Sequence, residues 1–96
     1  MLVPFSATDV PTFQLTTRVN GEKRQSDSTD NMLFSFADIV SCLSRSFTLD
    51  LGDLVLTGTP AGTAIGQSTG FLKDGDLVEV EVSGVGSLRN HCRELA

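Results

Sequence analysis

The sequence predicts an α+β fold with mostly antiparallel strands and one main helix. Two strand-like segments separated by Asn20-Gly21 predict a β-hairpin near the start of the chain. One segment with helical periodicity follows, and the rest returns to short strand-like segments divided by glycine-containing turns. The 96 residues are too few for two separate hydrophobic cores, so residues 1–96 are expected to form a single domain or part of one.

The hairpin is predicted over residues 12–26. Residues 12–19 alternate in polarity, and one face of this strand collects Phe13, Leu15, Thr17 and Val19. Asn20-Gly21 is a strong two-residue turn signal because both positions need a positive φ. The returning strand, residues 22–26, begins with three charged residues, which favour a solvated face or a sheet edge.

A helix is predicted over about residues 35–46. Its apolar residues recur at helical spacing and form one stripe, which consists of Phe36, Ile39, Val40, Leu43 and Phe47. Ser35 can cap the N-terminus together with Asp38, as in a capping box. Arg45 is expected in the last turn, where a positive charge is favoured.

Three further strands are predicted after the helix, over residues 54–57, 77–83 and 87–90. In the second of these, three valines on one face alternate with Glu79 and Glu81 on the other. Two glutamates at strand spacing are typical of the solvated face of a sheet.

Charge and hydropathy argue against two classes of partner. The net charge is −5 and the seven Lys and Arg residues are scattered, so no basic stripe is available for nucleic acid or an anionic membrane. The apolar runs span only a few residues, whereas a bilayer crossing needs about 20. The first eleven residues lack the features of a secretion signal. A cytoplasmic location is expected, with the interior of an organelle as the alternative.

Few residues suggest metal or nucleophile chemistry. Cys42 and Cys92 have neither a Cys-x-x-Cys spacing nor a histidine at metal-binding spacing, and are expected to be reduced structural thiols. His91, the single histidine, is expected to be structural or exposed. Asp27 and Asp30 could offer oxygen ligands to Mg²⁺, but two aspartates in a polar turn are usually solvated turn formers.

The stretch Thr57-Gly58-Thr59-Pro60-Ala61-Gly62 is the candidate binding loop. Glycine allows a ligand to approach the backbone closely, and proline stiffens the loop. Threonine hydroxyls and backbone N–H groups are donors suited to a carboxylate or enolate oxygen. Composition alone leaves a plain structural loop equally open.

Three stretches closely resemble the C-terminal part of the catalytic domain of the fumarylacetoacetate hydrolase family. They are TRVNGEKRQSDSTDNMLFSFADIVSCLS, GDLVLTGTPAGTAIGQ and LKDGDLVEVEVSGVGSLRN. The resemblance runs from about Phe13 to Asn90 and keeps the order and approximate spacing of the motifs. It implies part of a mixed β-roll or sandwich fold, which is usually dimeric in this family.

The resemblance also implies an activity. Members of the family look like enzymes that use Mg²⁺, Mn²⁺ or Ca²⁺ to act on small oxo acids, including intermediates of aromatic-acid breakdown. They hydrolyse acylpyruvates or fumarylacetoacetate, decarboxylate oxaloacetate-type acids or catalyse related isomerisations, while the metal stabilises an enolate. By this resemblance, Thr59 helps to hold the substrate carboxylate and Gly58 permits close backbone approach.

The family's metal ligands and catalytic residues lie upstream of the region that this chain resembles. They are a Glu-x-Glu pair, an Asp, a Lys and a His–Glu pair. Glu79-Val80-Glu81 has the letters of the first motif but lies in a late strand, where the family has no metal site. We therefore expect no catalytic residue and no metal ligand in this chain, and no activity from the chain alone.

Three hypotheses follow for the function. The chain is part of an enzyme of this family, or a truncated non-catalytic relative that acts as a binding or assembly partner, or it has built a new local site on Asp27, Asp30 and Thr59. Half of such a sheet has open edges and an uncovered apolar face, so we expect the chain to form a homo-oligomer, such as a dimer, or to fold incompletely.

Overall fold

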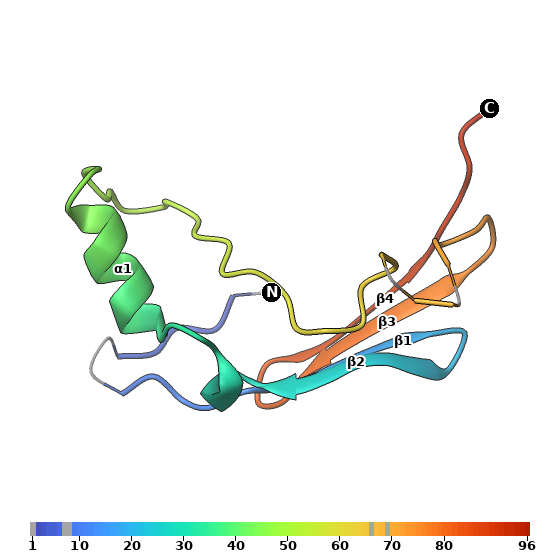
Figure 1. Cartoon of the computed structure of the whole chain (residues 1–96), viewed down its shortest axis with the longest axis horizontal. Coiled ribbons are helices and arrows are strands. Elements are labelled where there is room, and N and C mark those ends of the chain that lie inside the picture. Colours follow the sequence, from blue (N-terminus) through green and yellow to red (C-terminus); the bar gives the residue numbers. More distant parts are fainter. Residues whose placement is uncertain (1, 7–8, 66, 69) are drawn as a thin grey trace.

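A computed structural model describes residues 2–6, 9–65, 67–68 and 70–96 as a four-stranded antiparallel sheet with one α-helix standing away from it (Figure 1). The strands are β1 (Gln14–Val19), β2 (Glu22–Ser28), β3 (Leu77–Val82) and β4 (Gly86–His91). The helices are α1 (Phe36–Ser44) and the short 3-10 helix η1 (Thr29–Asn31). The strands are arranged in the sheet in the order β2-β1-β3-β4. This arrangement confirms the predicted α+β class, with antiparallel pairing and one main helix.

The first hairpin forms where the sequence predicts it. Asn20 and Gly21 have φ angles of 52° and 81°, so both turn residues adopt the expected positive φ. β2 continues two residues beyond the predicted end, because Asp27 and Ser28 pair with residues of β1. A register shift between Thr17 and Arg18 interrupts the pairing of β1 with β2.

The two faces of the sheet differ as the alternation predicts. Leu15 pairs with Val82, and Val19 with Val78, so β1 and β3 place apolar side chains on one face. Val19 is the one buried apolar residue among the described residues, with 6% of its surface exposed. The core is therefore very small.

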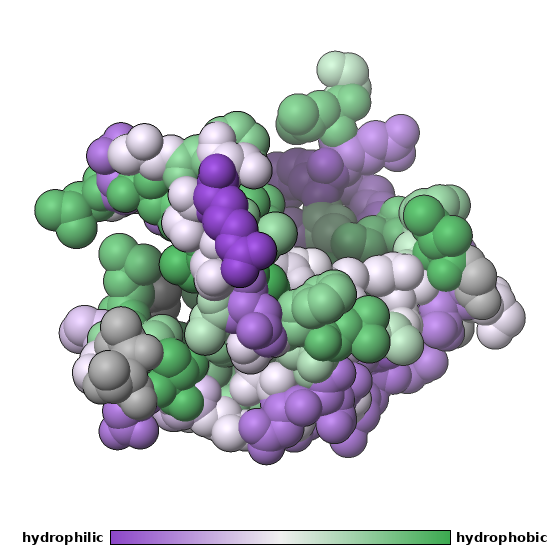
Figure 2. Space-filling view, turned by 60° about the vertical axis from the view of Figure 1, so that its left-hand side comes forward, coloured by the Kyte–Doolittle hydropathy of each residue, from purple (hydrophilic) through white to green (hydrophobic). Residues whose placement is uncertain are grey.

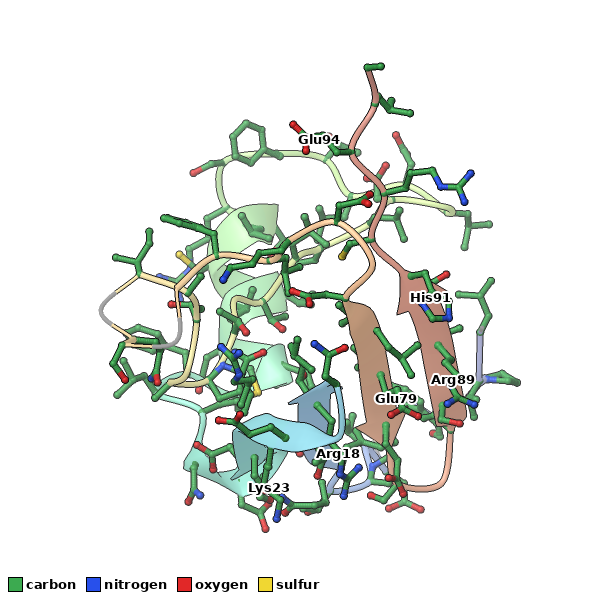
Figure 3. All side chains as sticks on the ribbon, turned by 90° about the vertical axis from the view of Figure 1, so that its right-hand side faces the viewer. Arg18, Lys23, Glu79, Arg89, His91 and Glu94 are labelled. Atoms are coloured by element: carbon green, nitrogen blue, oxygen red, sulfur yellow. The ribbon has the colours of Figure 1, made fainter. Side chains whose placement is uncertain are left out.

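The opposite face is charged and solvated. Adjacent strands there carry Arg18, Glu79 and Arg89 (Figure 3). Arg18 lies 3.4 Å from Glu81, and Arg89 lies 3.6 Å from Glu79. These contacts confirm the interpretation of Glu79 and Glu81 as residues of a wet sheet face. Ion pairs this exposed contribute little to stability.

The helix α1 begins with the predicted cap. The Ser35 hydroxyl accepts a hydrogen bond from the Asp38 backbone N–H, and the Asp38 carboxylate accepts one from the Ser35 N–H at 3.0 Å. These two bonds satisfy backbone N–H groups that have no partner within the helix. The helix ends at Ser44, so Arg45 occupies the C-cap rather than the last turn.

The prediction of a strand at residues 54–57 is wrong. This segment is irregular, and none of the backbone hydrogen bonds among the described residues joins it to a strand. Leu54 and Leu56 are 86% and 94% exposed. A run of apolar residues forms a strand only where a neighbouring strand pairs with its backbone, and this sheet places none beside the segment.

The described chain is open in shape. Its radius of gyration is 15.9 Å, whereas a compact chain of this length has about 13 Å. Hydrophobic side chains are spread over the face with α1 in front and are not covered by other parts of the chain (Figure 2). No described helix combines the length and the apolar character that a membrane crossing requires.

Candidate functional site

A pocket of about 450 Å³ lies between the candidate loop and the segment that leads from β2 into α1. Leu15 of β1 and Val82 of β3 also line it. Its sides include Thr57, Gly58 and Thr59 of the loop, and Asp27, Phe34 and Phe36 of the segment opposite. This pocket joins parts of the chain that are about 30 residues apart in sequence, which only the tertiary fold brings together.

The pocket combines polar and apolar lining residues. The loop side offers threonine hydroxyls and a glycine, whereas the opposite side carries Leu33, Phe34 and Phe36 around the start of α1. Polar residues of β2 and η1, Asp27 among them, line that side as well. A small ligand with a polar end and a carbon skeleton would find a partner for both parts here. The predicted site residues Gly58 and Thr59 both lie on the loop side.

Gly58 suits this position for a conformational reason. Its φ is 93°, a region that residues with a Cβ rarely adopt, and no atom lies within 4 Å of where a Cβ would be. The glycine is therefore required by the backbone turn rather than by crowding from the protein. The space beside it is open to a ligand.

The candidate loop is held against β2 by two contacts. The side-chain amide nitrogen of Gln25 donates to Thr59 Oγ1 at 2.8 Å and to the Pro60 carbonyl oxygen at 2.9 Å. Three residues later, Gly62 has a φ of 105° and lies so close to Arg24 that a Cβ would overlap the Arg24 carbonyl. Sequence reasoning assigned no role to Gln25, although the Arg-Gln pair lies within one of the stretches that carry the resemblance.

The proposed local site of Asp27, Asp30 and Thr59 is only partly assembled. Asp27 lines the same pocket as Thr59, but Asp30 does not and instead accepts a hydrogen bond from the Thr12 hydroxyl at 2.8 Å. The side-chain amide of Asn31, followed by the Ser28 N–H, lowers the pKa of Asp27 by donating to its carboxylate. These bonds give Asp27 a turn-forming role.

The candidate metal ligands are dispersed over the described residues. No group of three or more His, Cys, Asp or Glu side chains among them is arranged to hold a metal ion. Cys42 and Cys92 are free thiols, exposed and half-buried respectively, and His91 is exposed at the end of β4. None of these three residues lines the pocket.

Comparisons with known proteins agree on one family. The family model described as "Fumarylacetoacetate (FAA) hydrolase C-terminal" matches residues 1–93. Oxaloacetate tautomerase YisK of Bacillus subtilis is 43% identical over 75 residues, which are 77% of this chain and 25% of that protein.

Two solved structures are also similar. One is a probable 2-hydroxyhepta-2,4-diene-1,7-dioate isomerase from Mycobacterium abscessus, with a TM-score of 0.88 and 36% identity over 95% of this chain and 35% of that chain. The other is the fumarylacetoacetate hydrolase of Exiguobacterium antarcticum, with a TM-score of 0.82 and 42% identity over 88% of this chain and 31% of that chain. The chain thus spans between a quarter and about a third of the length of these relatives.

Proposed function

The chain belongs to the fumarylacetoacetate hydrolase family, and we propose on this basis that it supplies one wall of the substrate pocket of an enzyme acting on small oxo acids. The observation that carries the proposal is the position of Gly58 and Thr59 in one pocket with apolar side chains from around the start of α1. The named relatives are an oxaloacetate tautomerase, an isomerase of a dienedioate and a fumarylacetoacetate hydrolase. We therefore infer a substrate with a carboxylate next to a keto or enol group.

In this proposal, the loop binds the substrate carboxylate and the phenylalanines bind its carbon skeleton. The Thr59 hydroxyl donates a hydrogen bond to a substrate carboxylate oxygen, and Gly58 leaves room for that carboxylate beside the backbone. Phe34 and Phe36 contact the carbon skeleton and exclude water from it. Exclusion of water strengthens the hydrogen bond from Thr59, because the local dielectric constant falls.

The proposal includes a divalent metal, Mg²⁺, Mn²⁺ or Ca²⁺, which would act as a Lewis acid toward the substrate oxygens. The described residues do not fit such an ion, since no suitable group of three ligands is present among them. We therefore place the metal ligands and the catalytic residues outside this chain and assign no catalytic step to its residues.

The test is turnover of oxaloacetate and of an acylpyruvate by the purified chain, with and without Mg²⁺ or Mn²⁺. We expect no turnover by the chain alone. Turnover is expected when a separately produced N-terminal part of a family member, which carries the Glu-x-Glu ligands, is added. Metal-dependent turnover by the chain alone would show that a complete site exists within its residues, and would contradict the proposal.

The role of Thr59 is tested in the complemented enzyme. Thr59→Val keeps the shape of the side chain and removes the hydroxyl, so the KM for oxaloacetate is expected to rise about tenfold, as for the loss of one hydrogen bond to a charged group. Thr63→Val makes the same change outside the pocket and should leave the KM unchanged. Equal KM values for both variants would remove Thr59 from the proposed site.

A second candidate function is that of a non-catalytic assembly partner. The observation in its favour is the large apolar surface that the described residues leave exposed. If the two parts associate without any turnover of either substrate, this second function would be preferred.

A further inference from the structure

We propose that Gln25 is a positioning residue for the candidate site: its side-chain amide fixes Thr59 so that the threonine hydroxyl hydrogen is available to an anion in the pocket. This inference rests on the proposed function, because it assumes that Thr59 meets a substrate carboxylate. It assigns a role to a residue of β2 that does not itself line the pocket.

The orientation of the Gln25 amide follows from its second partner. Its nitrogen lies 2.9 Å from the Pro60 carbonyl oxygen, which can only accept a hydrogen bond. If the amide were turned around, two oxygen atoms would face each other at that distance. The nitrogen must therefore donate to Pro60, and its other hydrogen points to Thr59 Oγ1 at 2.8 Å.

This orientation determines what the Thr59 hydroxyl can do. A hydroxyl has one hydrogen to donate and two lone pairs that accept. Gln25 occupies one lone pair, and its amide nitrogen cannot accept, so the hydroxyl hydrogen must be donated elsewhere. A carboxylate oxygen in the pocket is a suitable acceptor, whereas a cationic or donor group would meet no such hydrogen.

The same contacts fix the backbone of the loop. Among the described residues, no hydrogen bond between two backbone groups involves residues 54–61. The backbone of this segment is therefore not fixed by secondary structure. Gln25 holds Thr59 and Pro60, and the close approach of Gly62 to Arg24 holds the next turn. A loop held in place before binding loses less conformational entropy when the ligand arrives.

The inference is tested by NMR on the full 96-residue chain, with ¹⁵N relaxation order parameters for the backbone amides of residues 54–62 other than Pro60 and a chemical-shift titration with oxalate. Oxalate serves as the probe, because it carries adjacent carboxylates and is not turned over. The variants are Gln25→Met, which removes the amide, and Gln25→Glu, whose carboxylate cannot donate to Pro60 and accepts the Thr59 hydroxyl hydrogen itself. Gln14→Met and Gln14→Glu are the matched controls on the neighbouring strand β1, outside the pocket.

We expect both Gln25 variants to have lower order parameters in residues 54–62, while β1 and β3 keep theirs. The shift changes caused by oxalate should need about tenfold more oxalate in Gln25→Met, because the hydrogen bond from Thr59 to a charged group is no longer held in place. The loss of oxalate binding should be larger in Gln25→Glu, where the hydroxyl hydrogen is withdrawn and a negative charge is added. In a Thr59→Val background, Gln25→Met should cause a much smaller loss of oxalate binding, since only its contact with Pro60 is then removed.

Unchanged order parameters of residues 54–62 in Gln25→Met would overturn the inference, and so would an equal loss of oxalate binding with or without the Thr59 hydroxyl. If oxalate causes no shift changes in the wild-type chain, substrate binding by this chain fails as a proposal. In that case the order parameters of the loop still decide whether Gln25 holds Thr59 in place.

Discussion

Asn20 connects two turns of the sheet through a single residue. Its side-chain nitrogen donates to Asp76 Oδ1 at 2.8 Å, and its side-chain oxygen accepts from the Leu77 N–H at 2.9 Å. Its own backbone N–H donates to the Leu77 carbonyl. The residue that turns the first hairpin therefore also fixes the start of β3, which lies more than 50 residues further along the chain.

The two roles of Asn20 can be separated. Asn20→Gly keeps the capacity for a positive φ but removes both side-chain hydrogen bonds, so the unfolding temperature is expected to fall by several degrees. Asn20→Ala removes the same bonds and also strains the turn, and should lower it further. Thermal unfolding followed by circular dichroism at a fixed protein concentration gives the unfolding temperatures of both variants. An unchanged value for Asn20→Gly would show that the turn alone explains the residue.

Asp76 gives the fold a dependence on pH. The Lys73 backbone N–H, followed by the Asn20 side chain, holds the pKa of Asp76 below its ordinary value of 3.8. Charged Asp76 therefore stabilises the fold at pH values above 3.8, and this contribution is lost as the pH falls through the lower pKa of the folded state. Asp76→Asn should weaken the loss of thermal stability below pH 3.8, because the titrating carboxylate is then absent. An acid profile identical to that of the wild-type chain would contradict this role.

At the scale of single residues, the sequence predicts contacts between residues that are close together in the chain. The Ser35–Asp38 cap and the Asn20-Gly21 turn each depend on residues within a few positions, so spacing alone was sufficient. The hydrogen bonds from Gln25 to Thr59 and from Asn20 to Asp76 span 34 and 56 positions. Such partners are set by strand register and loop path, which the local pattern does not contain.

At the scale of elements, the candidate loop and β2 form one unit. Gly58 and Gly62 both have a positive φ, but only at Gly62 would a Cβ overlap the backbone of β2. Gly58→Ala should therefore cost only about 1 kcal/mol, the penalty of the backbone conformation. Gly62→Ala should also displace the loop, and so lower the ¹⁵N relaxation order parameters of residues 54–62. Equal order parameters in the two variants would show that the close approach to Arg24 is not needed.

The helix α1 depends on its cap because few of its side chains are covered. None of its residues is fully buried, and Val40 is 47% exposed. Ser35→Ala removes the hydroxyl that accepts from the Asp38 N–H, and is expected to destabilise the helix by about 1 kcal/mol. Far-ultraviolet circular dichroism should show less helix. Ser41→Ala, in the middle of the helix, should preserve or increase helical content, because alanine is the better helix former.

The elements were predictable to different degrees. The hairpin, α1 and the two later strands have clear periodicity, and the structure places all of them close to the expected bounds. The segment 54–57 has a similar apolar pattern but forms no strand, because its partner is not among the described strands. The sequence pattern shows which residues are apolar, but it does not show whether a neighbouring strand is present to pair with them.

At the scale of the whole molecule, apolar surface is left uncovered. Leu33, Leu51 and Leu56 are almost completely exposed, and Val19 is the one buried apolar residue among the described residues. Such a surface favours association in water. We expect the purified chain to form dimers or larger species, with an average mass that rises with concentration in sedimentation experiments. A monomer with a sharp, cooperative thermal transition would contradict this expectation.

The order of the strands bears on how the chain reaches its folded state. β1–β2 and β3–β4 are hairpins with local contacts. The pairing of β1 with β3, by contrast, joins Leu15 to Val82, which are separated in the chain by β2, α1 and the loop. Closing so long a segment costs more chain entropy than closing either turn, so contacts of this kind slow folding. The two hairpins should therefore form early and separately, and their docking should limit the rate. A shorter connection between β2 and β3 would then speed refolding, with little effect on either hairpin.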